Sequence, residues 1–462
     1  MMSDEMRENF QDPTDRDLEL FHNFREVNTI APEQYGRFDV KRGLRNADGT
    51  GVVVGLTNIA DVHGYNMIDG VKTPDEGSLR YRGYDLYDLL GSPDDDRRFR
   101  FEEVAYLLMM GELPTRDQLD RFIAMIDAER ELPDGFTARI LMRETPRDVM
   151  NLLSRAILQL YAFDERAEER TAEHEIRTAM SLLSRLPRIT VLSYYAKQAR
   201  YDHGSMIMHR FIEGQSTAET ILSMLRPGRE FTPEEARMLD IMLCVHAEHG
   251  GGNNSTFTTR VLSSADTDPY STYAASIGSL KGYRHGGANH KVRAMQAEVK
   301  QNVRDWSNDD ELAAYLRRIA NKQAFDGTGL IYGMGHAVYT KSDPRAVIGK
   351  RFAERLAAGT EFEDEYRLLE SIERLSPEIL AERGIAKDMC ANVDMYSGFV
   401  YSMMGIPEDL YTPLFACARM AGWAAHRFEE VVSGKRIMRP AYKNTRVGDD
   451  AVRPYVPMDE RE

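Results

Sequence analysis

The sequence predicts a mainly α-helical protein with one minor β-hairpin near its N-terminus. Apolar residues recur at helical spacing from Phe101 onward, whereas strand-like runs are confined to residues 51–56 and 79–82. Strands and helices do not alternate along the chain, which argues against a parallel α/β sheet. Of the 462 residues, 42% are hydrophobic, which is enough for a large core. We therefore expect many packed helices.

The N-terminal part of the chain is expected to contribute little to that core. Residues 1–49 are charged and weakly periodic, which predicts an arm on the surface. Residues 51–56 and 79–82 favour strands. Residues 69–70 (Asp-Gly) and 74–75 (Pro-Asp) lie between these runs and are typical of turns, so the segment predicts a hairpin.

Apolar stripes predict the helices that follow. Residues 104–108 form one stripe ended by Gly111, and residues 149–160 and 180–186 repeat the pattern. Residues 271–281 are rich in small side chains, as in a tightly packed buried helix. The helices are expected to be punctuated at Pro187, Pro227, Gly228 and Pro233.

The last third of the chain predicts four further helices. Residues 310–323 form one, and Pro344 begins another. Residues 362–375 are amphipathic and are expected to end before Pro377, and residues 414–432 predict a long amphipathic helix.

Charge and cysteine content exclude several classes of protein. The net charge of −15 argues against a partner such as nucleic acid or an anionic membrane. No apolar run approaches the roughly 20 residues of a membrane span, and the polar, acidic N-terminus is unlike a secretory signal. Cys244, Cys390 and Cys417 lie in apolar surroundings without metal-ligand spacing, which is typical of buried thiols in a reducing compartment. We expect a cytoplasmic protein.

Two histidine–glycine turns between residues 243 and 292 are the strongest functional signal. His249 and His285 each stand directly before a glycine pair, with asparagine close behind. Glycine lets the backbone approach a ligand, and imidazole exchanges protons near neutral pH. Such a histidine on its own is more often a helix cap, but two turns of this kind in one short stretch favour a site.

Three further residues fit the same interpretation. His336 follows a second glycine-broken segment, Asp394 lies in an otherwise apolar run, and Arg419 lies among small and apolar residues. A buried arginine is most often half of an internal ion pair, yet it can equally hold an anionic ligand. Together these residue types permit acid–base chemistry on an anionic carbonyl compound.

Other site classes fit the sequence less well. A metal site would draw on His246, His249, His285 and His336, but no HExxH motif or histidine-rich cluster accompanies them, so we expect no metal. Residues 249–252 imitate an oxyanion loop, but no serine has glycine at both −2 and +2, as an α/β-hydrolase requires. Residues 333–335 (Gly-Met-Gly) do not make a dinucleotide-binding fingerprint.

The sequence resembles the citrate synthase family, in its bacterial citrate/2-methylcitrate synthase group. The resemblance runs from about Tyr81 to the C-terminal Arg-Pro and is specific at four blocks in the same order. The blocks are His246-Ala-Glu-His-Gly-Gly-Gly-Asn, His285-Gly-Gly-Ala-Asn, Gly335-His-Ala-Val-Tyr with Asp343-Pro-Arg, and Asn392-Val-Asp-Met-Tyr-Ser-Gly. It implies an acyltransferase of the citrate (Si)-synthase type in the tricarboxylic acid cycle, which condenses acetyl-CoA with oxaloacetate and needs no cofactor.

The resemblance also assigns roles to individual residues. Asp394 would remove a methyl proton from acetyl-CoA, His285 would hydrogen-bond the thioester oxygen, and His336 would polarise the ketone of oxaloacetate. The substrate carboxylates would be held by His249, Arg345, Arg419 and Arg439, the last reaching in from the second subunit of a homodimer.

The resemblance further implies a large helical domain at residues 50–286 with 404–462, and a small domain at 287–403 that closes over the active site. Basic residues that approach CoA phosphates in many relatives are replaced here by Ala337 and Thr340, which leaves Lys341 as the CoA contact. His290 stands where Glu or Gln is usual.

Two alternatives stay open at the level of sequence. A 2-methylcitrate synthase would use propionyl-CoA, and one methyl group in an apolar pocket changes selectivity by only ~1–3 kcal/mol. A non-catalytic helical paralogue is the other. Assembly beyond the dimer is also open.

Overall fold

The computed structural model describes residues 14, 24–91, 99–385, 388–445 and 453–461. Its contacts divide the chain into two compact units, residues 1–53 with 439–462, and residues 54–438. The described part of the first unit contains α2 (Phe24–Val27), α3 (Pro32–Arg37), η1 (Arg42–Leu44) and η6 (Met458–Glu460). The boundary expected between a large and a small domain at residues 286–287 stays a prediction.

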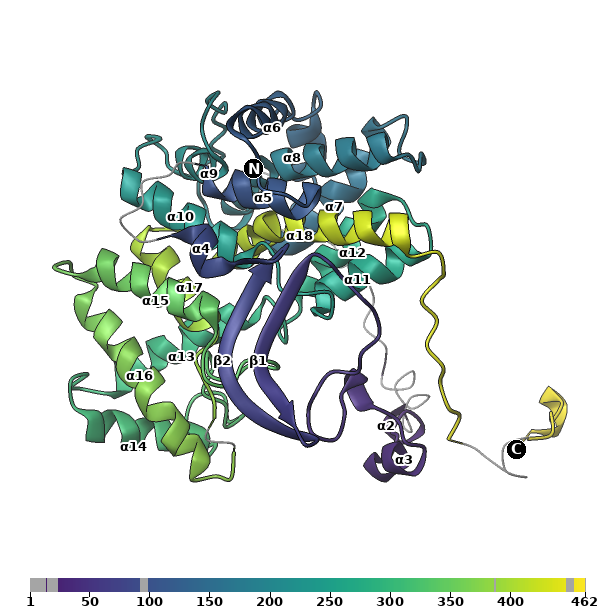
Figure 1. Cartoon of the computed structure of the whole chain (residues 1–462), viewed down its shortest axis with the longest axis vertical. Helices are drawn as coiled ribbons and strands as arrows, with labels where there is room; N and C mark the ends of the chain where they lie inside the picture. The colour runs from purple at the N-terminus through teal and green to yellow at the C-terminus, as the bar shows by residue number, and fades with distance from the viewer. Residues whose placement is uncertain (1–13, 15–23, 92–98, 386–387, 446–452, 462) are drawn as a thin grey trace. The chain divides into compact units, whose positions relative to one another are not determined.

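The second unit is built mainly of helices, and the mainly α fold class is confirmed (Figure 1). Its helices are α4 (Leu86–Leu90), α5 (Arg100–Met110), α6 (Arg116–Ala128), η2 (Thr137–Leu141), α7 (Val149–Leu160), η3 (Tyr161–Phe163), α8 (Ala172–Tyr201), α9 (Thr217–Leu225), α10 (Pro233–His246), α11 (Asn254–Ser264), α12 (Pro269–Lys281), α13 (Ala288–Asn302), α14 (Asp309–Ala320), α15 (Pro344–Ala357), α16 (Glu363–Ala381), α17 (Asp394–Met403), η4 (Glu408–Leu410) and α18 (Tyr411–Ser433). Among the described helices, none is both long and apolar enough to cross a membrane.

Helix α18 is central to the packing of this unit. Helices α5, α8, α10, α11 and α12 all pack against it, and Figure 1 shows it lying between α5 and α12. Every residue from Tyr411 to Arg427 is buried, including Arg419 and His426. Buried apolar side chains stabilise such a helix, but its charged groups need partners. Arg427 is paired with both oxygens of Glu175, at 2.6 and 2.7 Å. Arg419 and His426 belong to the candidate active site.

Local sequence signals account for several helix boundaries, and two expected stops are wrong. Thr115, Ser216 and Thr232 each form a capping box with the residue three positions later. However, α8 runs through Pro187 and α16 runs through Pro377. A proline inside a helix costs about 3 kcal/mol. Buried apolar residues on both sides of each proline offset that cost.

The expected hairpin exists, but its first strand lies later in the chain than predicted. Strand β1 (Ala60–Ile68) pairs antiparallel with β2 (Val71–Tyr81), and β2 pairs with β3 (Tyr84–Asp85). The turn at Asp69 and Gly70 is confirmed, because both residues have positive φ angles of 50° and 77°.

Two details of the predicted hairpin are wrong. Residues 51–56 form no strand, since only an isolated bridge joins Gly51 to Arg45. Residues 74–75 lie inside β2 and not in a turn. The strand register shifts between His63 and Tyr65, and Tyr65 lies opposite Pro74. A proline is tolerated in a strand at such an irregularity.

The hairpin packs directly on the loop of residues 338–342. A Cβ atom on Gly64 would come within 2.6 Å of Tyr339 Cα, and a Cβ on Gly77 within 2.1 Å of the Ser342 carbonyl oxygen. The Gly77 amide donates to Ser342 Oγ at 3.0 Å, and the Thr340 hydroxyl bonds the Gly64 carbonyl. Glycine is therefore required at both hairpin positions to let the two backbones meet.

Candidate active site

Two loops that are distant in sequence are joined by backbone hydrogen bonds. The Gly335 amide donates to the Cys390 carbonyl at 2.8 Å, and the Asn392 amide donates to the Gly333 carbonyl at 2.8 Å. Gly333 and Gly335 have φ angles of 88° and 86°, which side chains with a Cβ rarely adopt. The glycines therefore let the loop bend, and His336 is brought beside the start of α17.

The proton position on neutral His336 is fixed by its own loop. Its Nδ1 accepts hydrogen bonds from the backbone amides of Val338 and Tyr339, at 3.1 and 3.2 Å. A nitrogen that accepts two N–H groups carries no proton, so the neutral ring holds its proton on Nε2. His336 is therefore arranged as an Nε2–H donor.

His249 lies beside His336 in the loop that follows α10. The ring centroids are 5.0 Å apart at an interplanar angle of 83°. His249 Nε2 lies 3.1 Å from the hydroxyl oxygen of Tyr339. Burial, followed by the positive charges of Arg345 and the other nearby cationic groups, holds the pKa of His249 well below its usual value. His249 is thus a neutral imidazole at physiological pH.

His285 is held through Ser255. Its Nε2 lies 3.0 Å from Ser255 Oγ, which also accepts a hydrogen bond from Trp423 Nε1 at 3.2 Å. The Ser255 hydroxyl proton can be directed to His285 Nε2 or to Asn253 Oδ1 at 2.9 Å. When it goes to Nε2, the neutral ring carries its proton on Nδ1. Burial and the charges of nearby arginines lower the pKa of His285 to about 4.

Asp394 is the first residue of α17 and is partly buried. Burial raises the pKa of its carboxyl to about 6, although the charge of Arg345 and a hydrogen bond from Asn289 act in the opposite direction. The Asn289 Nδ2 to Asp394 Oδ1 distance is 3.4 Å. The Asp394 amide donates to Asn392 Oδ1 at 3.0 Å, which fixes the start of the helix. A carboxyl with this pKa is suited to general-base work near neutral pH.

Arg419 is a buried cation with an unfilled hydrogen-bonding fork. Its Nε donates to the His246 carbonyl at 2.7 Å, while Nη1 and Nη2 have no partner among the described residues. Burial lowers the pKa of Arg419 to about 10, with the nearby Glu248 carboxylate opposing the shift. Two parallel N–H donors without a partner match the two oxygens of a carboxylate.

Arg345 is the second buried arginine of the candidate site, and part of its guanidinium is already paired with a carboxylate. Its Nε and Nη2 bond both oxygens of Asp343 at 3.0 and 2.7 Å. The guanidinium lies 5.7 Å from the centroid of the Tyr339 ring. Although burial opposes its charge, Asp343 raises the pKa of Arg345 above the usual arginine value. Arg345 therefore stays cationic in the interior.

The buried carboxylate of Glu248 balances the positive charge of Arg419. Glu248 is fully buried, and its Oε1 lies 3.0 Å from His426 Nε2. Arg260 Nη1 donates to His426 Nδ1 at 3.1 Å, so a neutral His426 carries its proton on Nε2 and donates it to Glu248. Burial opposes ionisation, but His426 and Arg419 together keep the pKa of Glu248 below its usual value.

Sequence reasoning assigned no role to several residues of this cluster. Hydrogen bonds join predicted site residues to Asp343, Ser255, Asn289 and Tyr339. The charge of Glu248 acts on Arg419 without a direct bond. Gly422 carries a signal in the sequence, because a Cβ there would lie 2.2 Å from Glu248 Oε2. A glycine inside the long predicted helix could have indicated a buried neighbour at that point.

Arg439 is exposed and belongs to the unit of residues 1–53 and 439–462. Two further residues singled out by the sequence, Lys341 and His290, lie outside the hydrogen-bonded cluster. Lys341 is exposed on the loop after Thr340. His290 stacks on the Tyr411 ring, with centroids 6.4 Å apart and 13° between the planes. The roles of Arg439 and Lys341 therefore stay predictions.

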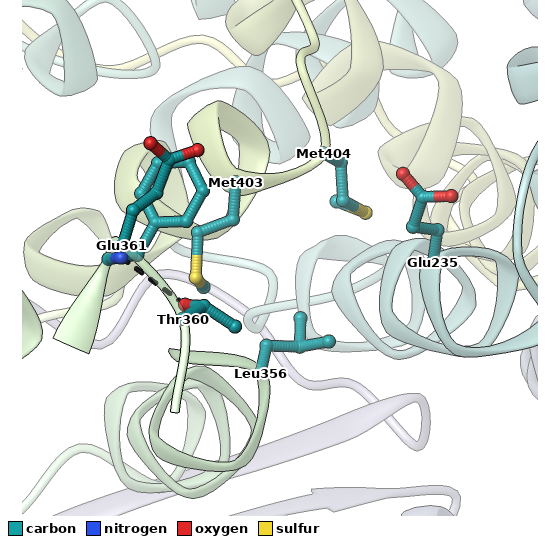
Figure 2. A pocket seen from close by; sticks show the side chains of 7 residues that line it. Glu235, Leu356, Thr360, Glu361, Met403 and Met404 are labelled. Atoms are coloured by element: carbon teal, nitrogen blue, oxygen red, sulfur yellow. Dashed lines mark hydrogen bonds between the residues drawn. The ribbon is translucent and has the colours of Figure 1, made fainter. Parts of the chain in front are cut away.

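A cavity of about 370 Å³ lies elsewhere, between the start of α10 and the ends of α15 and α17 (Figure 2). It is lined by Glu235, Leu356, Thr360, Glu361, Phe362, Met403 and Met404. The predicted site residues are not among its lining residues, so this cavity is separate from the candidate active site. Over the part of the chain that the structure describes, no group of three or more His, Cys, Asp and Glu side chains could hold a metal ion.

Comparison with known proteins gives one consistent result. Residues 46–441 match the family model described as citrate synthase, C-terminal domain. A citrate synthase of Acidithiobacillus ferridurans is 36% identical over 395 residues, covering 83% of this chain and 93% of that protein. A 2-methylcitrate synthase of Shewanella oneidensis is 32% identical over 366 residues, covering 79% of this chain and 87% of that protein.

A solved structure gives the same result. It is the ternary complex of citrate synthase from Thermoplasma acidophilum with carboxymethyl coenzyme A and oxaloacetate. The fold superposes with a TM-score of 0.73 at 27% identity, covering 91% of this chain and 99% of that one.

Proposed function

Because the chain belongs to the citrate synthase family, we propose that it joins the methyl carbon of acetyl-CoA to the ketone carbon of oxaloacetate and releases citrate and CoA. The family is one of acyltransferase-type enzymes. The observation that carries the proposal is the unfilled fork of buried Arg419, which lies in a cluster with neutral histidines and an aspartate of raised pKa. Such a cluster suits an anionic substrate that must lose or gain protons.

The first step is removal of a methyl proton from acetyl-CoA by Asp394. A thioester methyl is a very weak acid, so the developing oxyanion must be stabilised as the proton leaves. His285 supplies that hydrogen bond from Nδ1 when Ser255 donates to its Nε2. One preorganised donor of this kind typically contributes ~3 kcal/mol to transition-state stabilisation.

The second step joins the enolate carbon to the ketone of oxaloacetate. His336 hydrogen-bonds the ketone oxygen from Nε2–H and gives this proton to the alkoxide as the carbon–carbon bond forms, and the proton that Asp394 took from the methyl group restores His336 afterwards. The Nδ1 contacts with two backbone amides support this role, because they leave the proton on Nε2. Water then hydrolyses the citryl thioester to citrate and CoA. Water is kept out until condensation by closure of residues 287–403 over the site.

The carboxylates of oxaloacetate are held by Arg419, Arg345 and His249, with Arg439 contributed by the second subunit of a homodimer. Burying a dianion without several such partners would be prohibitive. Lys341, which is exposed, is the proposed contact for a CoA phosphate. We propose that no cofactor is needed beyond the two substrates. The three free, buried cysteines support a reducing, cytoplasmic setting.

Propionyl-CoA is the second candidate acyl donor. The chain is similar to proteins named 2-methylcitrate synthase at 30–32% identity and to proteins named citrate synthase at 32–36%. The two identity ranges meet at 32%, so sequence identity does not separate the two substrates. One extra methyl group changes selectivity by only ~1–3 kcal/mol.

The test is the release of free CoA thiol from each acyl-CoA, with and without oxaloacetate. Mass spectrometry identifies the acid formed, and kcat/KM for the two acyl-CoAs decides the natural substrate. Asp394→Asn serves as the control, because it keeps the shape of the side chain and removes the base. If the wild-type protein releases no thiol in an oxaloacetate-dependent manner with either donor, the helical scaffold interpretation replaces the proposed function.

A further inference from the structure

Tyr339 contacts three residues of the candidate site at once. Its hydroxyl oxygen is 3.1 Å from His249 Nε2, and its backbone amide donates to His336 Nδ1. Its ring lies against the His336 ring, with centroids 4.7 Å apart and 31° between the planes, and the Arg345 guanidinium lies over it. The residue is 2% exposed. No sequence motif considered above assigned this residue a role.

The backbone of Tyr339 is held in place from behind by the hairpin. Gly64 in β1 approaches its Cα so closely that a Cβ would not fit, and Gly77 in β2 approaches its ring. Thr340 then bonds the Asp75 amide at 3.1 Å, and Ser342 bonds the Gly77 amide. These bonds anchor the residues on the C-terminal side of Tyr339, so its side chain is directed towards the histidines by a fixed backbone.

We propose that Tyr339 is a positioning residue that sets the proton position and orientation of His249 and His336 for oxaloacetate. The inference rests on the proposed function and assigns Tyr339 no contact with the reacting atoms. The backbone amide acts on His336, and the hydroxyl acts on His249. The two contacts are chemically independent, so they can be separated by substitution.

In the proposed arrangement, the Tyr339 hydroxyl donates to His249 Nε2. Burial raises the pKa of the Tyr339 phenol well above its usual value, so the phenol keeps a proton that it can donate. A phenol that donates to Nε2 leaves the proton of neutral His249 on Nδ1. The two neighbouring histidines then carry opposite tautomers, with Nδ1–H on His249 and Nε2–H on His336. Each ring therefore keeps one N–H donor, and the two donors are on different ring atoms.

Tyr339→Phe removes only the hydroxyl and keeps the ring against His336. We expect KM for oxaloacetate to rise about tenfold, the usual effect of one lost hydrogen bond, while kcat changes by less than about twofold. Tyr339→Leu also removes the ring, so kcat should fall in addition. Tyr273→Phe is the matched control, because Tyr273 is a buried tyrosine whose hydroxyl has no partner among the described residues. Its kinetics should match wild type.

Nitrogen-15 NMR of the wild-type histidines tests the same inference without any substitution. We expect a protonated Nδ1 on His249 and a protonated Nε2 on His336, and loss of the His249 preference in Tyr339→Phe. The proposal is overturned by a wild-type His249 protonated on Nε2, or by a folded Tyr339→Phe with unchanged KM. Wild-type thiol release is measured first, because its absence would refute the proposed function and not the tautomer assignment.

Discussion

The Nε–H of Arg419 donates to the backbone carbonyl of His246, with 2.7 Å between the two heavy atoms. This bond holds one edge of the guanidinium against the last residue of α10 and leaves both Nη atoms for a ligand. The positive charge is balanced by Glu248, two residues further along, without a direct bond between them. The arginine is thus fixed in orientation and compensated in charge before any substrate binds.

Replacing Arg419 by lysine should weaken oxaloacetate binding more than it slows turnover. Lysine keeps the charge but cannot present two parallel donors to a carboxylate. We expect the Kd for oxaloacetate, measured by calorimetry, to rise by about 10- to 100-fold, since hydrogen bonds to charged groups contribute roughly 1.5–3 kcal/mol. Arg317→Lys is the control, because Arg317 forms an exposed pair with Glu382. An unchanged Kd in Arg419→Lys would contradict the role of the fork.

The catalytic rate at low pH should depend on the protonation state of the Asp394 carboxyl. With a pKa of about 6 for its carboxyl, kcat/KM is expected to fall below pH 6 as the base becomes protonated. Asn289→Leu removes the hydrogen bond that lowers this pKa, so the acid limb should move to higher pH. A limb that does not move would show that another group controls it.

The raised pKa of the Asp394 carboxyl also predicts that the stability of the fold depends on pH. Its folded-state pKa of about 6 exceeds the ordinary value of 3.8, so folding disfavours the ionised form. Above pH 6 the folded wild type carries an ionised, partly buried carboxylate, whereas below about pH 4 the group is protonated in both states. Asp394→Asn should therefore have a higher Tm than wild type at pH 8, and this advantage should disappear as the pH falls to 4. Equal Tm values at pH 8 would contradict the burial cost.

Mixed dimers test whether Arg439 serves the partner subunit. Arg439→Leu and Asp394→Asn chains, each expected to be inactive, are unfolded, mixed equally and refolded. About half of the dimers should be hybrids with one intact site, so activity should recover to roughly a quarter of wild type. If Arg439 instead acts within its own chain, every site carries one of the two substitutions and no activity is recovered. Native mass spectrometry that shows hybrids without activity would then assign Arg439 to its own subunit.

Gly77→Ala tests the contact between the hairpin and the loop of residues 338–342. The added Cβ would meet the Ser342 carbonyl at 2.1 Å, so one backbone must move. We expect a loss of about 1–3 kcal/mol in the free energy of unfolding and a rise in KM for oxaloacetate, because Tyr339 shifts with the loop. Gly278→Ala in α12 is the control, since nothing lies within 4 Å of its added Cβ. There, alanine should leave KM unchanged and stabilise the helix slightly.

The sequence determined the helical class and most of the chemistry. Apolar spacing identified α7, small side chains identified α12, and a proline following an aspartate identified the start of α15. The glycine-broken turns picked out His249, His285 and His336, because unusual backbone beside a polar side chain is visible in a single chain. Local signals did not predict helix ends correctly where packing against distant segments keeps the helix going, as at Pro187 inside α8. No local pattern records what the other face of a helix contacts.

Only the tertiary structure decided how the site is held together. Tyr339 reads as an ordinary core residue until its hydroxyl is seen at His249, and Glu248 reads as a surface charge until α18 buries it against His426. The proton positions on the histidines likewise depend on amides and hydroxyls brought in from other segments. Residue types are fixed by the sequence, but desolvation and charge balance depend on which segments meet in space, so the pKa values and donor directions of the site follow from the fold.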